Sequence, residues 1–302
     1  MRITARGPAV GAAALAMALL AAVAGCSSGS GDGDSGSRLL TGLRTLAGDS
    51  DTKQVTYLDA AAVQKLSKGD ANRFASVAQP GSFMMGSDGS RLLGQSFRVT
   101  QIDTAVDTDE AGHWEGSFDA SAITKSLKSN GYTRSEKNGE EVWTQKGTGP
   151  SLQVSDDEIS YSGRGSDPMS AVDPEDGSSL ADDKQFRRAA ECLGDVYRAD
   201  FNPNGSSDPV PLSALGQQAS SAAENTEVLC FVVKDDATAQ ELKSKLKAAV
   251  GAEAPKFDGA EVTVEKGDLP VVRAVVPDTA GQRPGRLVIS DMELWMTAAT
   301  DQ

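Results

Sequence analysis

Histidine, cysteine, aromatic and basic residues are all scarce in this sequence. Its 302 residues include one His, three Cys and 5% aromatics, and 29 Lys and Arg stand against 43 Asp and Glu. The formal net charge is therefore −14 at pH 7. Nucleic-acid binding depends on clustered Lys and Arg, and so does electrostatic adhesion to anionic lipid. The charge argues against a nucleic-acid partner and against that mode of membrane attachment.

The scarcity of histidine also limits the chemistry that the sequence can support. His113 is the only His, and no second candidate base completes a Ser-His-Asp or Cys-His arrangement around it. We expect His113 to be a surface residue. No complete set of metal ligands and no phosphate-binding glycine loop occurs. The sequence therefore predicts no catalytic, metal-binding or cofactor-binding residue, no cofactor, and a protein that is not an enzyme.

One enzymatic alternative stays open. The 43 acidic residues could include a carboxylate pair of the kind that glycosidases use, which would make the protein an extracytoplasmic hydrolase. Sugar-binding sites usually stack sugars on aromatic rings, and aromatic residues are few here. The composition therefore favours a binding protein over a hydrolase.

The first 25 residues have the pattern of a secretory signal peptide. Arg2 and Arg6 form a basic start, and residues 11–24 are an uninterrupted run of small and apolar residues. A run of this length is too short for a bilayer core, which needs about 20 residues. We expect residues 1–25 to be a cleaved signal and the mature protein to be exported.

The end of this segment carries a more specific motif. Val23-Ala24-Gly25-Cys26 resembles the lipobox of bacterial lipoproteins, in which an aliphatic residue and two small residues precede an invariant Cys. The resemblance implies a diacylglyceryl group on Cys26, cleavage after Gly25, and anchoring to the outer face of the cytoplasmic membrane. Two acyl chains anchor stably where one does not.

Two polar stretches divide the exported part. Residues 26–37 are almost all Gly, Ser and Asp, which predicts a flexible tether. Residues 163–183 have the composition of a linker, with Pro, Gly, Ser and Asp dominating. We therefore expect an N-terminal domain over residues 38–162 and a C-terminal domain over residues 184–302.

The two predicted domains are similar in outline. In each, an Asp caps a helix, Asp119 in the first and Asp235 or Asp236 in the second. After each helix comes a hairpin signal, and residues 138–147 can be laid over residues 258–267 at an offset of 120. The order of elements predicts an α+β fold with two similar domains, each an antiparallel sheet with helices packed on one face.

Several further elements follow from local patterns. Apolar spacing predicts helices over residues 98–106, 182–199 and 213–223. Apolar runs bounded by turn residues predict strands over residues 112–117, 227–233, 271–276, 286–289 and 293–297.

The cysteines that remain after Cys26 are Cys192 and Cys230. In an oxidising compartment an even pair is expected to form a disulfide. Redox-active motifs place two Cys close together, so a spacing of 38 favours a structural bond. We predict that this bond fastens a helix to the second sheet.

Apolar residues outside any amphipathic period lie at 83–85 and 292–296. Met and aromatic residues in loops can form adaptable binding surfaces, or they can close the open end of a sheet. The second role is the one we expect.

A second, weaker resemblance covers about residues 90–145. A strand ending in Trp114-Glu115-Gly116-Ser117-Phe118-Asp119, then a helix, Gly131-Tyr132 and a short hairpin, is similar to exported lipoproteins of uncharacterised function from high-GC Gram-positive bacteria. That family supplies no catalytic or binding residue. The function that we expect is a lipid-anchored, non-catalytic binding or accessory module, whose partner is an envelope protein or a small ligand.

Overall fold

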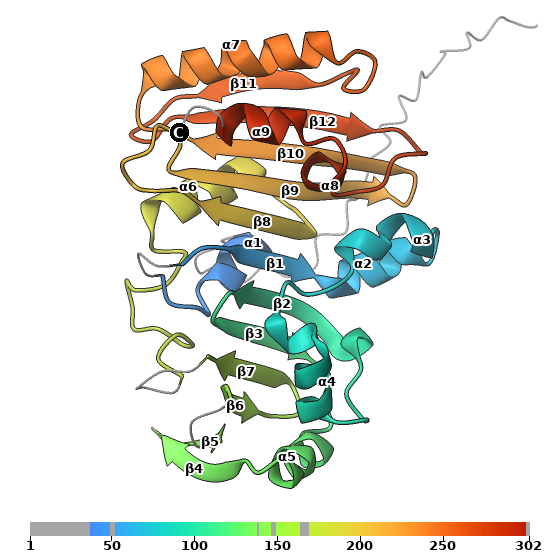
Figure 1. Cartoon of the computed structure of the whole chain (residues 1–302), viewed down its shortest axis with the longest axis vertical. Coiled ribbons are helices and arrows are strands. Elements are labelled where there is room, and N and C mark those ends of the chain that lie inside the picture. Colours follow the sequence, from blue (N-terminus) through green and yellow to red (C-terminus); the bar gives the residue numbers. More distant parts are fainter. Residues whose placement is uncertain (1–36, 49–51, 138, 146–148, 164–168, 300–302) are drawn as a thin grey trace, which may run out of the picture. The chain divides into compact units, whose positions relative to one another are not determined.

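The computed structural model describes residues 37–48, 52–137, 139–145, 149–163 and 169–299 (Figure 1). In this part of the chain, twelve strands form one antiparallel sheet in the order β11-β12-β10-β9-β8-β1-β2-β3-β7-β6-β5-β4. The fold is thus α+β with a large antiparallel sheet and several helices, as the sequence predicts at this level.

The strands of the two halves have the following bounds. The first half contributes β1 (Val55–Asp59), β2 (Ile102–Thr108), β3 (Ala111–Gly116), β4 (Thr133–Lys137), β5 (Glu140–Thr144), β6 (Ser151–Val154) and β7 (Glu158–Ser162). The second contributes β8 (Arg198–Pro203), β9 (Leu212–Ser221), β10 (Glu224–Val232), β11 (Glu261–Glu265) and β12 (Val271–Asp278).

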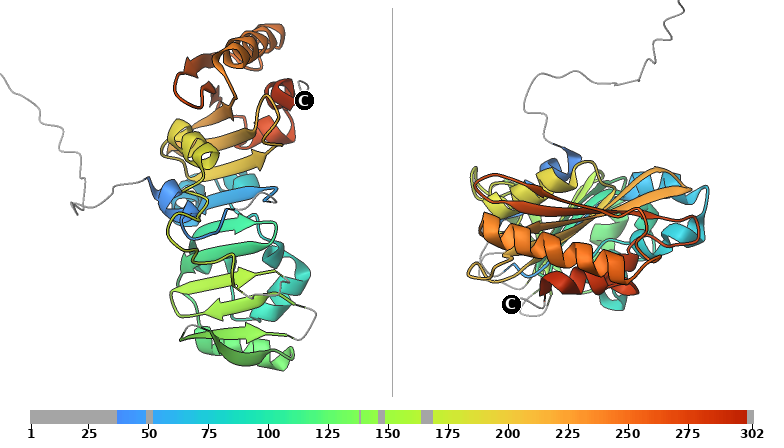
Figure 2. Two further views of the ribbon diagram at one scale, coloured as in Figure 1. Left: turned by 90° about the vertical axis from the view of Figure 1, so that its left-hand side faces the viewer. Right: turned by 90° about the horizontal axis from the view of Figure 1, so that it is seen from above.

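The helices are distributed over both faces of the sheet. They are α1 (Arg38–Leu43), α2 (Ala60–Ser67), α3 (Ala71–Phe74), α4 (Ser87–Leu93), α5 (Ala120–Ser129), α6 (Lys184–Leu193), α7 (Asp236–Ala252), α8 (Arg286–Ile289) and α9 (Glu293–Ala299). Tyr57 and Leu58 on β1 point to opposite faces, and they belong to different apolar cores. The core around Tyr57 takes in α1 and α6, whereas α2 to α5 and α7 to α9 cover the other face (Figure 2). The expectation that helices lie on one face only is therefore wrong.

The two halves join edge to edge. β1 pairs antiparallel with β8, with Tyr57 opposite Ala199, so both halves belong to one continuous sheet. The predicted division into two domains is not confirmed.

The halves nevertheless share their connectivity. In the first, β1, β2 and β3 are antiparallel neighbours in chain order with α2 to α4 inserted between β1 and β2, α5 follows, and the last strand β7 returns to pair with β3. In the second, β8-β9-β10 form a meander, α7 follows, and the last strand β12 returns to pair with β10. By this order β6 and β7 correspond to β11 and β12, and the β4–β5 hairpin has no counterpart. The offset of 120 instead aligns β5 with β11, so it does not give the structural correspondence.

The predicted helix caps are confirmed. The Asp119 carboxylate accepts a hydrogen bond from the Ala122 N–H at 2.9 Å, and that of Asp235 accepts one from the Thr238 N–H at 2.8 Å. An Asp at this position accepts from N–H groups of the first turn that lack a helical partner. α6 begins in the same way at Asp183 and ends at Leu193, earlier than predicted, because Gly194 adopts a φ of +69°.

Four predicted elements have the wrong type. Residues 213–223 lie mostly in β9, and residues 98–106 form a short 3₁₀ turn followed by β2. Residues 286–289 and 293–297 are helical, in α8 and α9. β9 lies in the middle of the sheet and is buried on both faces from Leu212 to Gly216, so its apolar residues do not alternate. A short apolar run does not distinguish a strand from a buried helix.

The predicted linker lies only partly in the described residues. Within residues 169–183, Val172 forms an isolated bridge with Leu46 and Ser179 forms one with Ala47. Val172 and Leu180 are buried in the core that also contains α1 and α6. Residues 169, 172 and 179–181 are therefore buried against the rest of the fold, whereas residues 175–178 between them are exposed.

Candidate ligand-binding site

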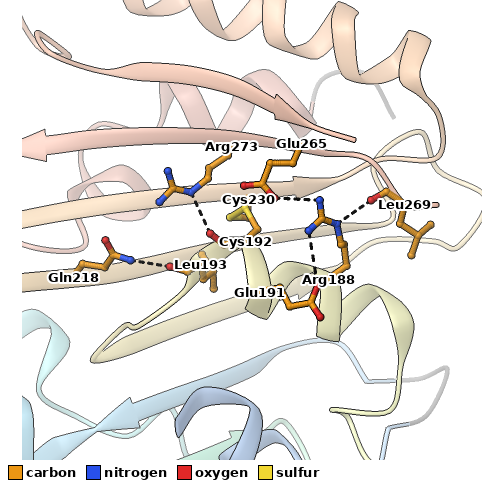
Figure 3. Close-up of a disulfide and its surroundings, with 9 residues drawn as sticks. All are labelled: Arg188, Glu191, Cys192, Leu193, Gln218, Cys230, Glu265, Leu269 and Arg273. Carbon is orange, nitrogen blue, oxygen red and sulfur yellow. Dashed lines mark hydrogen bonds and ion pairs between the residues drawn. A yellow bond between two sulfur atoms is a disulfide. The ribbon is translucent and has the colours of Figure 1, made fainter. Parts of the chain in front are cut away.

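The predicted disulfide is confirmed. Cys192 on α6 and Cys230 on β10 are bonded, with their Cα atoms 6.2 Å apart, and both are buried (Figure 3). Polar contacts reinforce the same junction. Arg273 Nε donates to the Cys192 carbonyl at 3.1 Å, and the Arg188 guanidinium pairs with Glu265 at 3.1 Å. The bond has the structural role that the sequence predicts, which is to hold α6 on the sheet.

The other predicted site residue, Cys26, lies outside the described residues. Within residues that the structure describes, no helix is both long and apolar enough to cross a membrane. The same residues contain no cluster of three or more His, Cys, Asp or Glu that could hold a metal ion.

The prediction that His113 is a surface residue is wrong. Its side chain faces the core beneath α1, and the residue is 7% exposed because both faces of β3 are covered. His113 Nδ1 lies 3.0 Å from Ser160 Oγ on β7, and that hydroxyl donates to Glu158 Oε1 at 2.6 Å. The structure thus brings His113 on β3 together with Ser160 and Glu158, which are close to each other on β7 but distant from His113 in the sequence. Ser160 is 0% exposed, so its hydroxyl is not available to attack a substrate.

Among the buried carboxyl groups, Asp107 in the first half and Glu227 in the second have strongly raised pKa values. Asp107 Oδ1 accepts from Trp114 Nε1 at 2.8 Å and from the Tyr161 hydroxyl, whereas Asp107 Oδ2 has no hydrogen-bond partner. Burial raises the pKa of Asp107 to about 6. Burial likewise raises the pKa of Glu227 to about 7, and the nearby Asp278 carboxylate acts in the same direction.

A cavity of about 720 Å³ opens at the seam between the two halves. We call it the seam cavity. Four segments line it, which are the start of α1 at Arg38 and Leu39, the end of β1 with α2, the α6–β8 connection of residues 194–197, and the end of β9 with residues 218–222. β1 and β8, the paired first strands of the two halves, bring these segments together.

The seam cavity combines apolar surface with charges of both signs. Leu66, Val196 and Ala219 contribute apolar surface, and the exposed Lys65 and Asp195 contribute charge. Arg38 Nη1 lies 2.9 Å from Asp59 Oδ2, which fixes the start of α1 to the end of β1.

The polar groups of the wall are held by neighbouring elements. The other oxygen of Asp59 caps α2 by accepting from the Ala62 N–H at 2.8 Å. Gln218 Nε2 donates to the Leu193 carbonyl at 2.8 Å, and Arg73 Nη1 donates to the Ala222 carbonyl at 2.8 Å. Such a lining, with apolar walls and a few fixed polar groups, is typical of a small-ligand site.

No pattern in the sequence indicated this site. Its lining comes from segments between residues 38 and 222, and none of them carries a recognisable binding motif. The apolar outliers are divided between two roles. Met84 and Leu294 are buried, as expected of residues that close a core, whereas Phe83, Met292 and Met296 are exposed.

Comparison with known proteins adds little. No family model matches the chain, and no curated protein does either. The chain is similar to one solved structure, described as "Structure of crystal form I of TP0453", with 13% identity over 87% of this chain and 100% of the other, at a TM-score of 0.39. A likeness at this score carries no argument about fold or function.

Proposed function

We propose that the protein is an exported lipoprotein, anchored through Cys26 to the outer face of the cytoplasmic membrane, and that it acts there as a non-catalytic binding module. The observation that carries the proposal is the seam cavity, which is built from both halves and has the mixed lining of a ligand site. The lipobox and the polar tether after it support the anchor.

The shared connectivity supports a finer proposal about the fold. Residues 38–162 and 184–302 are two copies of one α+β unit, joined through their first strands. The copies differ in several elements: the first has α2 to α4 inserted between β1 and β2 and the additional β4–β5 hairpin, and the second has the longer helix α7 and the C-terminal helices α8 and α9. On this proposal the seam cavity exists only because the two copies are joined.

Filling the seam cavity is expected to abolish ligand binding. Ala62 lines the cavity on α2, and the neighbouring Ala61 is exposed and outside the lining. Native mass spectrometry of the full-length protein, purified in detergent, should detect a retained molecule. Ala62→Trp should lose at least about nine-tenths of that signal, because the indole occupies the cavity. Ala61→Trp is the matched control and should retain it. A retained molecule that Ala62→Trp leaves in place would contradict the assignment of the site.

Removing the lipidated residue is expected to release the protein from the membrane. Cys26→Ala leaves no thiol for the diacylglyceryl group, so the protein should move almost entirely from the membrane fraction to the medium or stay unprocessed. Fractionation followed by mass analysis of the amino terminus measures this, with Ser27→Ala as the control that keeps the thiol. Normal processing and membrane retention of Cys26→Ala would overturn the proposed anchor.

The seam cavity also bears on the hydrolase alternative. Asp59 and Asp195 both line it, so they are the carboxyl groups that such an enzyme would offer there. Asp59, however, is committed to Arg38 and to the α2 N-terminus. A broad hydrolase screen with Asp195→Asn tests the alternative, since turnover that this variant loses would favour an enzyme over a binding module.

A further inference from the structure

The place that corresponds to the seam cavity in the other half is filled by the chain itself. β1 and β8 are the first strands of the two halves and pair antiparallel, so an approximate two-fold axis between them exchanges the halves. The exchange brings the end of β9 onto the end of β2. It also brings the α6–β8 connection onto the α1–β1 connection.

At the end of β2, residues 169–181 lie against residues 43–48. The Ala47 N–H donates to the Ala171 carbonyl at 3.0 Å, and the Leu180 N–H donates to the Leu46 carbonyl at 2.9 Å. Further bonds run from Asp173 to Thr45 and from Ala181 to Leu43. Residues 43–48 therefore hold residues 169–181 through backbone hydrogen bonds. A cavity of only about 40 Å³ stays open beside Leu46, Ala171 and the end of β2.

At the end of β9 the corresponding place is open. The α6–β8 connection is short, and among the described residues no hydrogen bond uses the backbone N–H or C=O of Asp195 or Val196. The seam cavity of about 720 Å³ lies beside these groups. Backbone groups without protein partners at the wall of a cavity are what an extended chain pairs with.

We infer that the seam cavity binds an extended peptide segment of a partner protein, held by backbone hydrogen bonds to Asp195 and Val196 as residues 169–181 are held by residues 43–48. The inference rests on the proposed binding function and names the class of its ligand. Small apolar side chains of the peptide would contact Leu66 and Ala219, and an acidic residue would meet Lys65 at the rim. Residues 169–181 have this composition, with three acidic residues and no basic one.

A peptide with the sequence of residues 169–181 is the probe. Labelled with fluorescein, it should bind the full-length protein in detergent saturably by anisotropy. Ala62→Trp should weaken that binding about tenfold or more, and Ala61→Trp should leave it unchanged.

The backbone character of the contact is tested on the probe itself. The N–H groups of Leu180 and Ala181 are the donors in the filled half, so N-methylation at both should weaken binding about tenfold. N-methylation at Asp176, whose N–H makes no hydrogen bond to described residues, is the matched control and should have little effect.

The outcomes separate the two proposals. A cavity that retains a non-peptide molecule sensitive to Ala62→Trp, with no binding of the probe, overturns the peptide inference and leaves the binding function standing. Probe binding that Ala62→Trp does not weaken, or that N-methylation at Leu180 and Ala181 does not weaken, also overturns the inference. If neither a retained molecule nor the probe binds, both proposals fail.

Discussion

Replacing Cys192 and Cys230 together by Ala is expected to lower the free energy of unfolding by about 4 kcal/mol. The bond closes a loop of 38 residues, and the chain-entropy treatment gives that value for a loop of this length. For a protein of this size the melting temperature should fall by about 10 °C. Thermal unfolding followed by circular dichroism measures the change.

Two comparisons separate the covalent bond from side-chain packing. Wild-type protein refolded in reductant keeps both thiol side chains but lacks the bond, so it should melt close to the double variant. The double variant itself should not respond to reductant. If reduced wild-type protein melted with the oxidised form, the disulfide would contribute no stability, and the loss in the double variant would come from the cavities left by two buried side chains.

The sequence correctly predicted features, such as helix caps and the disulfide, that depend on the residue types themselves and their near neighbours. Asp119 and Asp235 begin helices because a carboxylate at that position satisfies the first N–H groups, whatever the rest of the chain does. The disulfide followed from the expectation that the chain is exported and that Cys26 is lipidated, which leaves two cysteines to form a pair. Neither inference needs knowledge of distant contacts.

The wrong predictions concern features that depend on contacts between residues far apart in the sequence. β9 lies between β8 and β10, so both of its faces are buried and its apolar residues follow no strand alternation. His113 is buried because α1 and β7 cover it, and neither is close to it in sequence. The seam cavity depends on the pairing of β1 with β8, two strands about 140 residues apart, so no window of sequence contains it.

Stability is expected to fall as the pH rises from about 4 to 7, because the buried carboxyl groups of Asp107 and Glu227 bind protons more tightly in the folded state. The pKa of Asp107 rises from 3.8 to about 6, mainly by burial, against the opposing hydrogen bonds of Tyr161 and Trp114 and the charge of Arg198. The pKa of Glu227 rises from 4.5 to about 7. When an acid has a raised pKa in the folded state, its stabilising contribution is complete below the unfolded pKa, falls as the pH rises from the unfolded to the folded pKa, and is gone above the folded pKa. By pH 8 the ionisation of each group should have lowered the free energy of unfolding by about 3 kcal/mol, at 1.36 kcal/mol per pKa unit.

Asp107→Asn isolates one of these groups, because the two oxygens of Asp107 have different surroundings. An amide can keep the acceptor for Trp114 and Tyr161 and place its NH₂ where Oδ2 has no partner. The variant should gain about 3 kcal/mol relative to wild type between pH 4 and pH 8, measured by urea unfolding followed by tryptophan fluorescence.

Glu227→Gln is the contrasting variant. Both oxygens of Glu227 accept hydrogen bonds, from Gln217 Nε2 at 3.0 Å and from the Arg286 and Leu287 N–H groups at 3.0 and 3.3 Å. An amide NH₂ there faces a donor, so this variant should be less stable at every pH at which wild type carries the charge. If Asp107→Asn had the same pH dependence as wild type, the Asp107 carboxyl would not be the group that titrates, and the loss of stability above pH 4 would belong to other acids.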